Sequence, residues 1–246
     1  MGLDPFFNER ATIEVFEHAF YAGDEAAEEV GAILAWRPVP RRILDVGCNA
    51  GPHALEWARR GAEAVGVDVA PVAIDLARRR AAALAPDARV RFEVADLLEG
   101  RLDRWGRFDL VTALGGVFNC IERADLVPAF EAVRAALAPG GEFVFDVLRW
   151  FEGRRKTFLR RDARGALKIV WEFELDPMRG RGHVLGHFLE TGAVQDSDRA
   201  FYTAPEITTL LGLAGLERTG VAGDLAFSEP AESAEPSLFF RARARD

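Results

Sequence analysis

The chain of 246 residues has no long apolar run and very few cysteines. No hydrophobic stretch approaches the roughly 20 residues that a membrane-spanning helix needs, so we expect no membrane partner. Cys48 and Cys120 are far apart in sequence, which predicts neither a disulfide framework nor a zinc site. The first residues, MGLDPFFNERATIEVF, have neither the basic nor the apolar region of a signal peptide. We therefore expect a cytoplasmic protein.

An excess of positive charge is also absent. The chain has 39 Asp and Glu residues against 31 Lys and Arg residues, and its formal net charge is −8. Neutralisation of phosphates dominates the affinity of proteins for nucleic acid, so an acidic chain is a poor general binder. Nucleic acid is therefore disfavoured as a partner, although one basic run, Arg149–Arg164, is a local exception.

Strand-like and helix-like segments alternate from Arg41 onward. The expected strands are RRILDV, EAVGVDV, ARVRFEVADL, RFDLVTALGG and GEFVFDVL. Helical patterns open at Pro52 and Pro71, and a third ends at the Pro139-Gly140-Gly141 turn. This alternation predicts the α/β class, with a doubly wound, mostly parallel sheet covered by helices on both faces.

The rest of the chain departs from this alternation. Residues 1–40 are expected to form a helical lid segment ahead of the main domain, which we assign to residues 41–149 and 201–246. Residues 150–200 contain period-two runs, such as ALKIVWEFELD, and predict an antiparallel β insert that acts as a substrate cap or a dimer contact. The alternating Arg241, Arg243 and Arg245 near the C-terminus predict an edge strand protected by charge.

The stretch ILDVGCNAGPHA, residues 43–54, loses side-chain bulk where the first strand ends. A loop at this place lies at the carboxyl edge of the sheet, where ligands bind, and small residues let the backbone approach a ligand closely. The helix that begins at Pro52 directs its free N–H groups to the same place. A plain tight turn is the alternative, and the context favours a ligand.

Acids at the ends of the next two strands indicate a nucleoside ligand. Asp68, with its neighbour Val69, follows Gly47 by about 20 residues and is placed to accept hydrogen bonds from two ribose hydroxyls. The alternative for Asp68 is a helix N-cap. Asp96 and Leu97 suit an adenine, because the acid can accept the exocyclic amine and the leucine can pack on the ring.

Together these motifs resemble the class I S-adenosylmethionine-dependent methyltransferases of the small-molecule type, over roughly residues 41–148 and the C-terminal helix and strands. The family's first motif, an acid followed by Gly-x-Gly-x-Gly, falls on Asp45, Gly47, Cys48, Asn49, Ala50 and Gly51, with Asn49 in place of the middle glycine. Asn tolerates a left-handed backbone, so the loop can still form.

The resemblance implies a seven-stranded sheet with an antiparallel last strand, and S-adenosyl-L-methionine as cofactor, which leaves as S-adenosyl-L-homocysteine. It adds Ala113, Leu114 and Gly115, at the end of the fourth strand, to the cofactor-binding residues. A nicotinamide cofactor is disfavoured, because GCNAGPHA lacks the G-x-G-x-x-G pattern of dinucleotide-binding loops.

A methyltransferase of this kind needs positioning more than a dedicated base, so the sequence names no catalytic residue. Candidates are Asn119, His53 and Tyr21, each with a structural alternative: a satisfied turn, a solvated first helical turn and core packing. Four aromatic residues are candidates for a lid over the site, although core packing is the simpler role for each: Phe7, Phe16, Phe20 and Tyr21.

Two further features have simple explanations. His183 and His187 lie in a strand-like run, where four residues span about 13 Å at roughly 3.3 Å each, so we expect no shared metal ion. The basic run Arg149–Arg164 is expected to be a solvated hairpin, with a gate for an anionic substrate or a tRNA contact as alternatives.

We therefore expect methyl transfer to N or O of a small-molecule acceptor, with a homodimer as an option. The alternatives are an RNA (tRNA) methyltransferase that uses the basic run, and a non-catalytic cofactor-binding protein.

Overall fold

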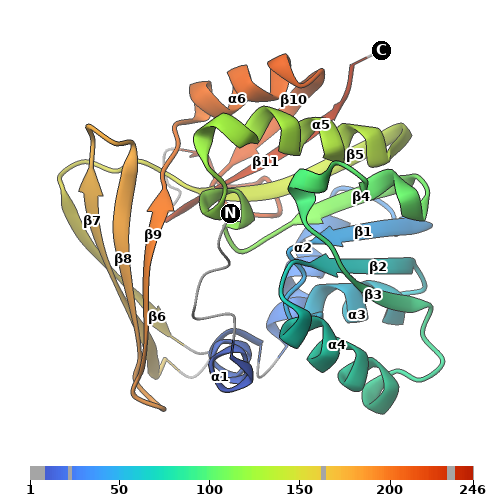
Figure 1. The fold of residues 1–246 in the computed structure, drawn as a ribbon, viewed down its shortest axis with the longest axis horizontal. Helices are drawn as coiled ribbons and strands as arrows, with labels where there is room; N and C mark the ends of the chain where they lie inside the picture. Colours follow the sequence, from blue (N-terminus) through green and yellow to red (C-terminus); the bar gives the residue numbers. More distant parts are fainter. Residues whose placement is uncertain (1–8, 22–23, 162–164, 232–235, 246) are drawn as a thin grey trace.

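The computed structural model describes residues 9–21, 24–161, 165–231 and 236–245. It contains a seven-stranded sheet and a separate four-stranded sheet, which stand side by side (Figure 1). Among the described residues, no helix is both long and apolar enough to cross a membrane.

The large sheet has the strand order β10-β11-β5-β4-β1-β2-β3. Its strands are β1 (Arg42–Val46), β2 (Glu63–Asp68), β3 (Val90–Val94), β4 (Phe108–Ala113), β5 (Leu137–Leu148), β10 (Leu216–Ala222) and β11 (Ser237–Ala244). Every pair is parallel except the two that β11 makes with β5 and β10. The expected fold class is confirmed. The order of connection reverses between β1 and β4, which is where sheets of this kind bind ligands.

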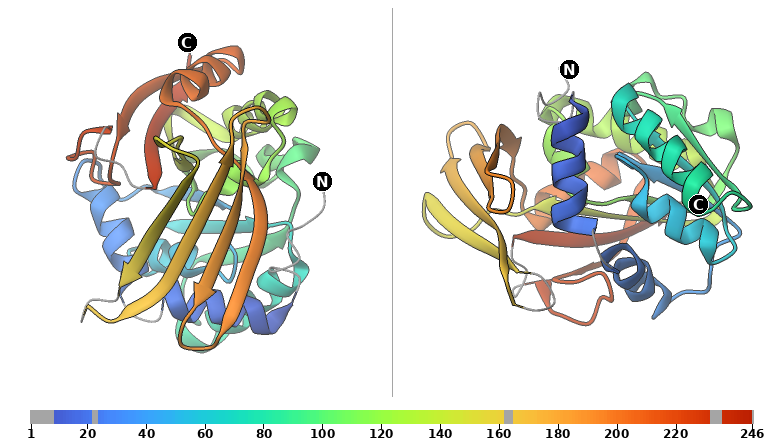
Figure 2. Two further views of the ribbon diagram at one scale, coloured as in Figure 1. Left: turned by 90° about the vertical axis from the view of Figure 1, so that its left-hand side faces the viewer. Right: turned by 90° about the horizontal axis from the view of Figure 1, so that it is seen from below.

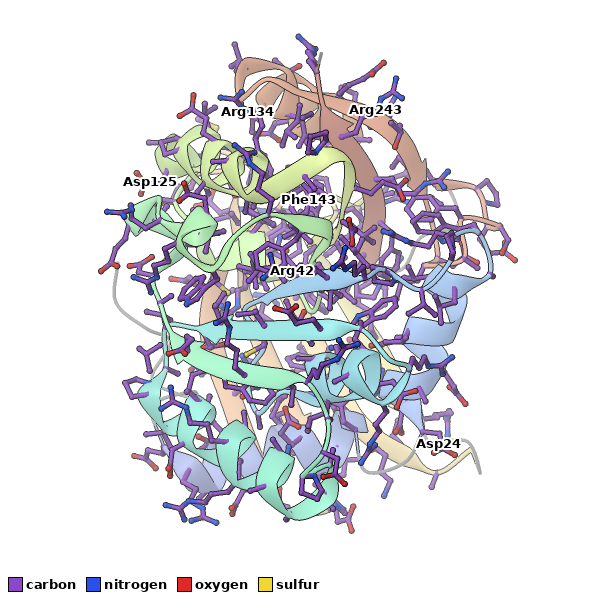
Figure 3. All side chains as sticks on the ribbon, turned by 90° about the vertical axis from the view of Figure 1, so that its right-hand side faces the viewer. Asp24, Arg42, Asp125, Arg134, Phe143 and Arg243 are labelled. Atoms are coloured by element: carbon purple, nitrogen blue, oxygen red, sulfur yellow. The ribbon has the colours of Figure 1, made fainter. Side chains whose placement is uncertain are left out.

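Two apolar clusters hold the helices to the two faces of this sheet. The main-domain helices are α3 (Pro52–Arg59), α4 (Pro71–Leu84), α5 (Leu126–Ala136) and α6 (Ala204–Leu213), with short 3₁₀ turns η2 (Leu97–Glu99), η3 (Leu102–Trp105), η4 (Val117–Cys120) and η5 (Arg123–Asp125). Alternate β1 residues face opposite sides: Leu44 packs in the cluster with α5 and α6, and Ile43 packs with α3 and α4. Figure 3 shows Phe143 inside the first cluster, while Arg134 and Arg243 lie at the margin.

Two expectations from the sequence need correction: where the third helix ends, and which strand lies at the edge of the sheet. The Pro139-Gly140-Gly141 stretch lies inside the bounds of β5, which begins at Leu137, and β4 and β5 shift register between Phe108 and Leu110. The edge strand on this side is β10, whereas β11, with Arg241 and its neighbours, lies between β10 and β5. Arg241 stacks on Trp36 and Phe227 and does not protect an edge.

The residues between β5 and α6 form the second sheet, which consists of β6 (Arg155–Arg161), β7 (Leu167–Asp176), β8 (Arg181–Phe188) and β9 (Ala193–Ala200) in antiparallel order (Figure 2). Arg123 fastens this insert to the core. Its guanidinium donates to Glu206 of α6, to the Gly180 carbonyl between β7 and β8, and to the Phe201 carbonyl.

The N-terminal segment contributes two helices, α1 (Arg10–Tyr21) and α2 (Glu25–Leu34). The helix α1 lies between the insert and α4 (Figure 2). Phe16 and Phe20 pack on the insert, and Ile13 packs among small residues of the main domain. The helix α2 packs on α3 through Val30 and Ile33.

Candidate functional site

A cavity of about 220 Å³ lies at the carboxyl ends of β1, β2, β3 and β4. Most of the predicted cofactor residues line it: Gly47, Cys48, Asn49, Asp68, Val69, Asp96, Leu97, Leu114 and Gly115. The sheet brings together residues that are far apart in sequence because all of them follow parallel strands. Residues of α1 and of the segment at and after η4 also line the cavity: Phe16, Tyr21, Val117, Cys120 and Ile121.

The loop between β1 and α3 follows an unusual backbone path. Gly47, Asn49 and Gly51 all have positive φ, at 69°, 48° and 81°. Asn49 therefore adopts the left-handed conformation expected of it. A Cβ on Gly51 would lie 2.5 Å from the ring of Phe92, so this glycine lets the loop close against β3. The loop needs its glycines for a close turn as well as for an approach to a ligand.

Asp68 lines the cavity, and it is not the N-cap of α4, which is Ala70 without a side-chain cap. Its two carboxylate oxygens accept the backbone N–H groups of Asn49 and Ala70, each at 2.9 Å. A carboxylate offers about four acceptor positions, so each oxygen can still accept one hydroxyl group. Burial raises the pKa of Asp68, and the backbone donors oppose that rise. The same side chain thus orders the loop and faces the cavity.

Asp96 and Leu97 lie side by side at the far end of the cavity. One oxygen of Asp96 accepts the N–H of Leu98 at 2.8 Å and caps the short turn η2. Leu97 is buried, and Leu98 lines the cavity beside it. This corner combines a carboxylate with apolar surface, which is the chemistry expected for an adenine.

Three of the predicted cofactor residues lie outside the cavity lining. Asp45 is buried beneath the loop, where its Oδ1 accepts the Thr112 hydroxyl at 2.7 Å. Burial raises the pKa of Asp45, while the charge of His53 lowers it. Gly51 turns toward Phe92, and Ala113 is in the apolar core. These residues support the cavity from behind.

The structure corrects the role considered for Asn119. Its side-chain amide donates to the carbonyls of Ala200 and Leu148, and its oxygen accepts the N–H of Leu148. Asn119 is 1% exposed and does not line the cavity. All of its polar groups are used to join η4 to β5 and β9, so we do not retain it as a catalytic candidate.

The other two candidates, His53 and Tyr21, both line the cavity and contact each other. Their rings pack edge to face with centroids 5.2 Å apart. Phe16 and Phe20 stack at 4.4 Å and continue this aromatic surface toward Trp171 of the insert. Phe7, the remaining residue of the expected lid, lies outside the described residues.

The protonation of His53 and Tyr21 follows from the charges around them. Burial lowers the pKa of His53, but Glu29 and Asp45 together raise it above its ordinary value. Burial raises the pKa of Tyr21 well above its ordinary value, and Glu29 and Glu17 raise it further. These shifts favour the protonated form of both side chains.

Three polar contacts near the cavity were not expected from the sequence. Asp146 on β5 is buried, and its Oδ1 accepts the N–H groups of Gly115 and Gly116 at 2.7 and 3.0 Å. An acid inside the apolar run GEFVFDVL is the one sequence feature that indicates it. Two further contacts, Arg199 with Cys120 and Glu29 with His53, join segments that are far apart in the chain. No pattern in the sequence indicates them.

His183 and His187 occupy the strand β8, as expected. Each contacts acidic side chains on the outer face of the insert: His183 approaches Asp196 and Asp198, and His187 approaches Glu172. Within the described part of the chain, no cluster of His, Cys, Asp and Glu has the arrangement of a metal site.

The described part of the basic run, residues 149–161, does not form one continuous surface. Because side chains alternate along β6, Arg155 points outward and pairs with Glu174, while Arg160 points inward and stacks on Phe20. Arg149 donates to the carbonyl of Ala231. The charges of the run are therefore divided between two faces and a loop.

Comparison with known proteins indicates the type of domain to which these residues belong. A family model described as a methyltransferase domain matches residues 43–141, which span β1 to the beginning of β5. No curated protein sequence matches the chain significantly.

Solved structures resemble the chain over nearly its whole length. The CcbJ methyltransferase from Streptomyces caelestis is 19% identical, with a TM-score of 0.76 over 100% of both chains. CalS10 from Micromonospora echinaspora, an amino pentose methyltransferase with S-adenosylmethionine bound, is 26% identical, with a TM-score of 0.67 over 95% of this chain and 96% of that chain. The sugar N-methyltransferase KedS8 from Streptoalloteichus is 22% identical, with a TM-score of 0.65 over 97% and 94%. Residues 43–141 therefore match a methyltransferase domain, and the chain has the fold of these methyltransferases.

Proposed function

We propose that this enzyme transfers a methyl group from S-adenosylmethionine to the nitrogen of an amino sugar or a related small amine. The observation that carries this proposal is the contact between the cofactor cavity and the inner face of the insert. Arg199 of β9 contacts the Sγ of Cys120 at 2.5 Å, and Cys120 lines the cavity. An acceptor held against the insert therefore reaches the cofactor end of the site.

The residues around the cavity fit the cofactor. The side-chain oxygen of Asn49 is buried and has no hydrogen-bond partner among the described residues, so it is an acceptor in need of a donor. Asp68 has free acceptor positions for two hydroxyl groups, and Asp96 and Leu97 offer a carboxylate beside apolar surface. When bound, S-adenosylmethionine supplies a methyl group that its sulfonium has already activated.

The inner face of the insert has the polar groups that a sugar needs. Gln195, Ser197 and Arg199 alternate along β9, and Gln195 and Arg199 are 3% and 8% exposed. The Ser197 hydroxyl is buried without a hydrogen-bond partner among the described residues. Trp171 and Phe20 add aromatic surface beside this row. Hydroxyl groups and a ring face would both find partners here.

The protonation of the cavity residues favours nitrogen over oxygen as the acceptor atom. A hydroxyl group must lose its proton to attack, which requires a base. The raised pKa values of Tyr21 and His53, which line the cavity, favour their protonated forms. An amine can lose its proton to water before it binds, and positioning then supplies most of the catalysis.

Calorimetric titration with S-adenosylmethionine, S-adenosylhomocysteine and NAD tests the cofactor part of this proposal. The first two should bind and NAD should not. Asp68→Ala should weaken the binding of S-adenosylmethionine and of S-adenosylhomocysteine by about 10- to 100-fold, because a charge-assisted hydrogen bond contributes about 1.5–3 kcal/mol. Asp75→Ala, on the exposed side of α4, is the matched control. Equal affinity of Asp68→Ala and wild type would contradict the assignment.

Turnover on paired acceptors tests the rest. Amino sugars should be methylated, whereas their counterparts with a hydroxyl in place of the amine should not. Methylation of the hydroxyl counterparts alone would contradict the choice of nitrogen. Cofactor binding without turnover on any acceptor would favour the non-catalytic alternative.

A further inference from the structure

His53 faces Glu29 across the gap between α3 and α2. The His53 Nε2 and Glu29 Oε2 atoms are 2.5 Å apart, and the His53 side chain is 6% exposed against 34% for Glu29. His53 is the second residue of α3, directly after the cofactor loop, and it lines the cavity. One ion pair thus joins the cofactor loop to the N-terminal segment.

Tyr21 adds α1 to the same cluster. Its ring packs edge to face on His53 and also lines the cavity. Side chains from α1 and α2 therefore both contact the imidazole of His53 on α3, and α1 and α2 belong to the N-terminal segment. The apolar contacts of α2 with α3 do not depend on this imidazole, because they use Val30 and Ile33.

The charges around His53 come from three elements. Glu29 on α2, Asp45 on β1 and Glu17 on α1 all act on it. Glu17 is buried and already paired with Arg80 of α4, while one oxygen of Asp45 has no hydrogen-bond partner among the described residues. A neutral imidazole would leave Glu29 and Asp45 without their shared cation.

We propose that the His53–Glu29 ion pair is a latch that positions α1 and α2 at the mouth of the cofactor cavity, and so couples the order of these helices to cofactor affinity. His53 is a positioning residue in this arrangement, because it acts through Tyr21 and Glu29. The effect on affinity rests on the proposed cofactor function, whereas the effect on the helices does not.

The test compares wild type with Glu29→Gln, His53→Gln and Glu28→Gln. Glu28 is exposed and directly precedes Glu29 on α2, so Glu28→Gln makes the same change of charge as Glu29→Gln without altering the contact with His53. Amide hydrogen exchange of α1 and α2 is measured without ligand. Exchange should be about tenfold faster in Glu29→Gln and His53→Gln, and unchanged in Glu28→Gln.

The affinity for S-adenosylhomocysteine is then measured by calorimetry across a series of pH values. At neutral pH both latch variants should bind about tenfold more weakly, within the range typical of coupled sites. Wild-type affinity should fall as pH rises through the pKa of His53, because the imidazolium is lost, and His53→Gln should lose this dependence. Any pH dependence that comes from ionisation of the ligand is the same for all variants, so the affinity of Glu28→Gln at each pH is the reference for this effect.

Unchanged exchange in both latch variants would overturn the proposal, whatever happens to affinity. Faster exchange with unchanged affinity and pH dependence would also overturn it, because the coupling would be absent. If wild type fails to bind S-adenosylhomocysteine, the coupling to affinity and the proposed function both fail, whereas unchanged exchange in a binding-competent wild type removes the latch alone.

Discussion

At the scale of single residues, the main feature of this site is a set of buried or half-buried carboxylates. Asp45, Asp68 and Asp146 each lie at or near the carboxyl end of a parallel strand and accept hydrogen bonds from the protein. Burial raises the pKa of each of them. Negative charge at these positions lowers the stability of the fold. A cationic cofactor bound beside the carboxylates would offset this cost.

Asp146→Asn should reduce the pH dependence of stability. The folded pKa of Asp146 is raised above 3.8, so its contribution to stability is largest below that pH and falls as pH rises through the folded pKa. Asn keeps an oxygen for the N–H groups of Gly115 and Gly116. The variant should therefore gain stability relative to wild type as pH rises from acid to neutral values.

Urea unfolding at several pH values measures this difference. Asp75→Asn is the control, because Asp75 lies exposed on α4. Parallel stability curves for Asp146→Asn and wild type would contradict the assigned burial cost.

The aromatic contact between α1 and the insert is the main feature at the scale of elements. Trp171 of β7 lies over Gly186 of β8, where a Cβ would collide with its ring. Trp171 in turn packs on Phe20 of α1 and on Phe188. The position of β7 relative to α1 therefore depends on a glycine in the neighbouring strand β8.

Gly186→Ala should impair acceptor binding more than cofactor binding. The added methyl group forces Trp171 to move, which costs about 1–3 kcal/mol of stability by overpacking. We expect the KM for the acceptor to rise by about tenfold or more, while the affinity for S-adenosylhomocysteine stays within about twofold.

Steady-state kinetics and calorimetry separate these two effects. The control is Gly31→Ala, since no atom lies within 4 Å of a Cβ at that position of α2. A loss of cofactor affinity as large as the loss of acceptor affinity would contradict the separate placement of the two sites.

At the scale of the whole molecule, the distribution of charge bears on the RNA alternative. The net charge is −8, and the basic run is divided between the two faces of the insert. Among the described residues of the run, the exposed arginines are Arg154, Arg155 and Arg161, and Arg155 is paired with Glu174, which leaves little free positive charge for a phosphate backbone. The alternative therefore has less support than its sequence suggested, and a homodimer through the insert stays a prediction.

Titration with tRNA at several salt concentrations tests this alternative. We expect no binding at physiological ionic strength, about 0.15 M, and at most weak binding at low salt. Arg155→Glu with Arg161→Glu should leave methyl transfer to the small acceptor unchanged. Tight, steeply salt-dependent binding that the double variant removes would support an RNA substrate.

The sequence by itself determined the fold class, and it predicted the cofactor and the end of the sheet at which the cofactor would bind. Those features depend on local patterns: strand and helix periodicity, a loop of Gly47, Asn49 and Gly51, and acids directly after strands. Parallel strands bring their carboxyl ends to one edge, so residues such as Asp68 and Asp96 converge without any further information.

Only the tertiary structure decided which candidate side chains are available for chemistry. Asn119 is engaged by backbone groups of β5 and the end of β9, and His53 by Glu29 of α2. The order of β10 and β11, and the contact of Arg199 with Cys120, were equally hidden. Such contacts arise where α2, the insert and the sheet pack together. No local periodicity encodes them, because each partner's position depends on the packing of the whole chain.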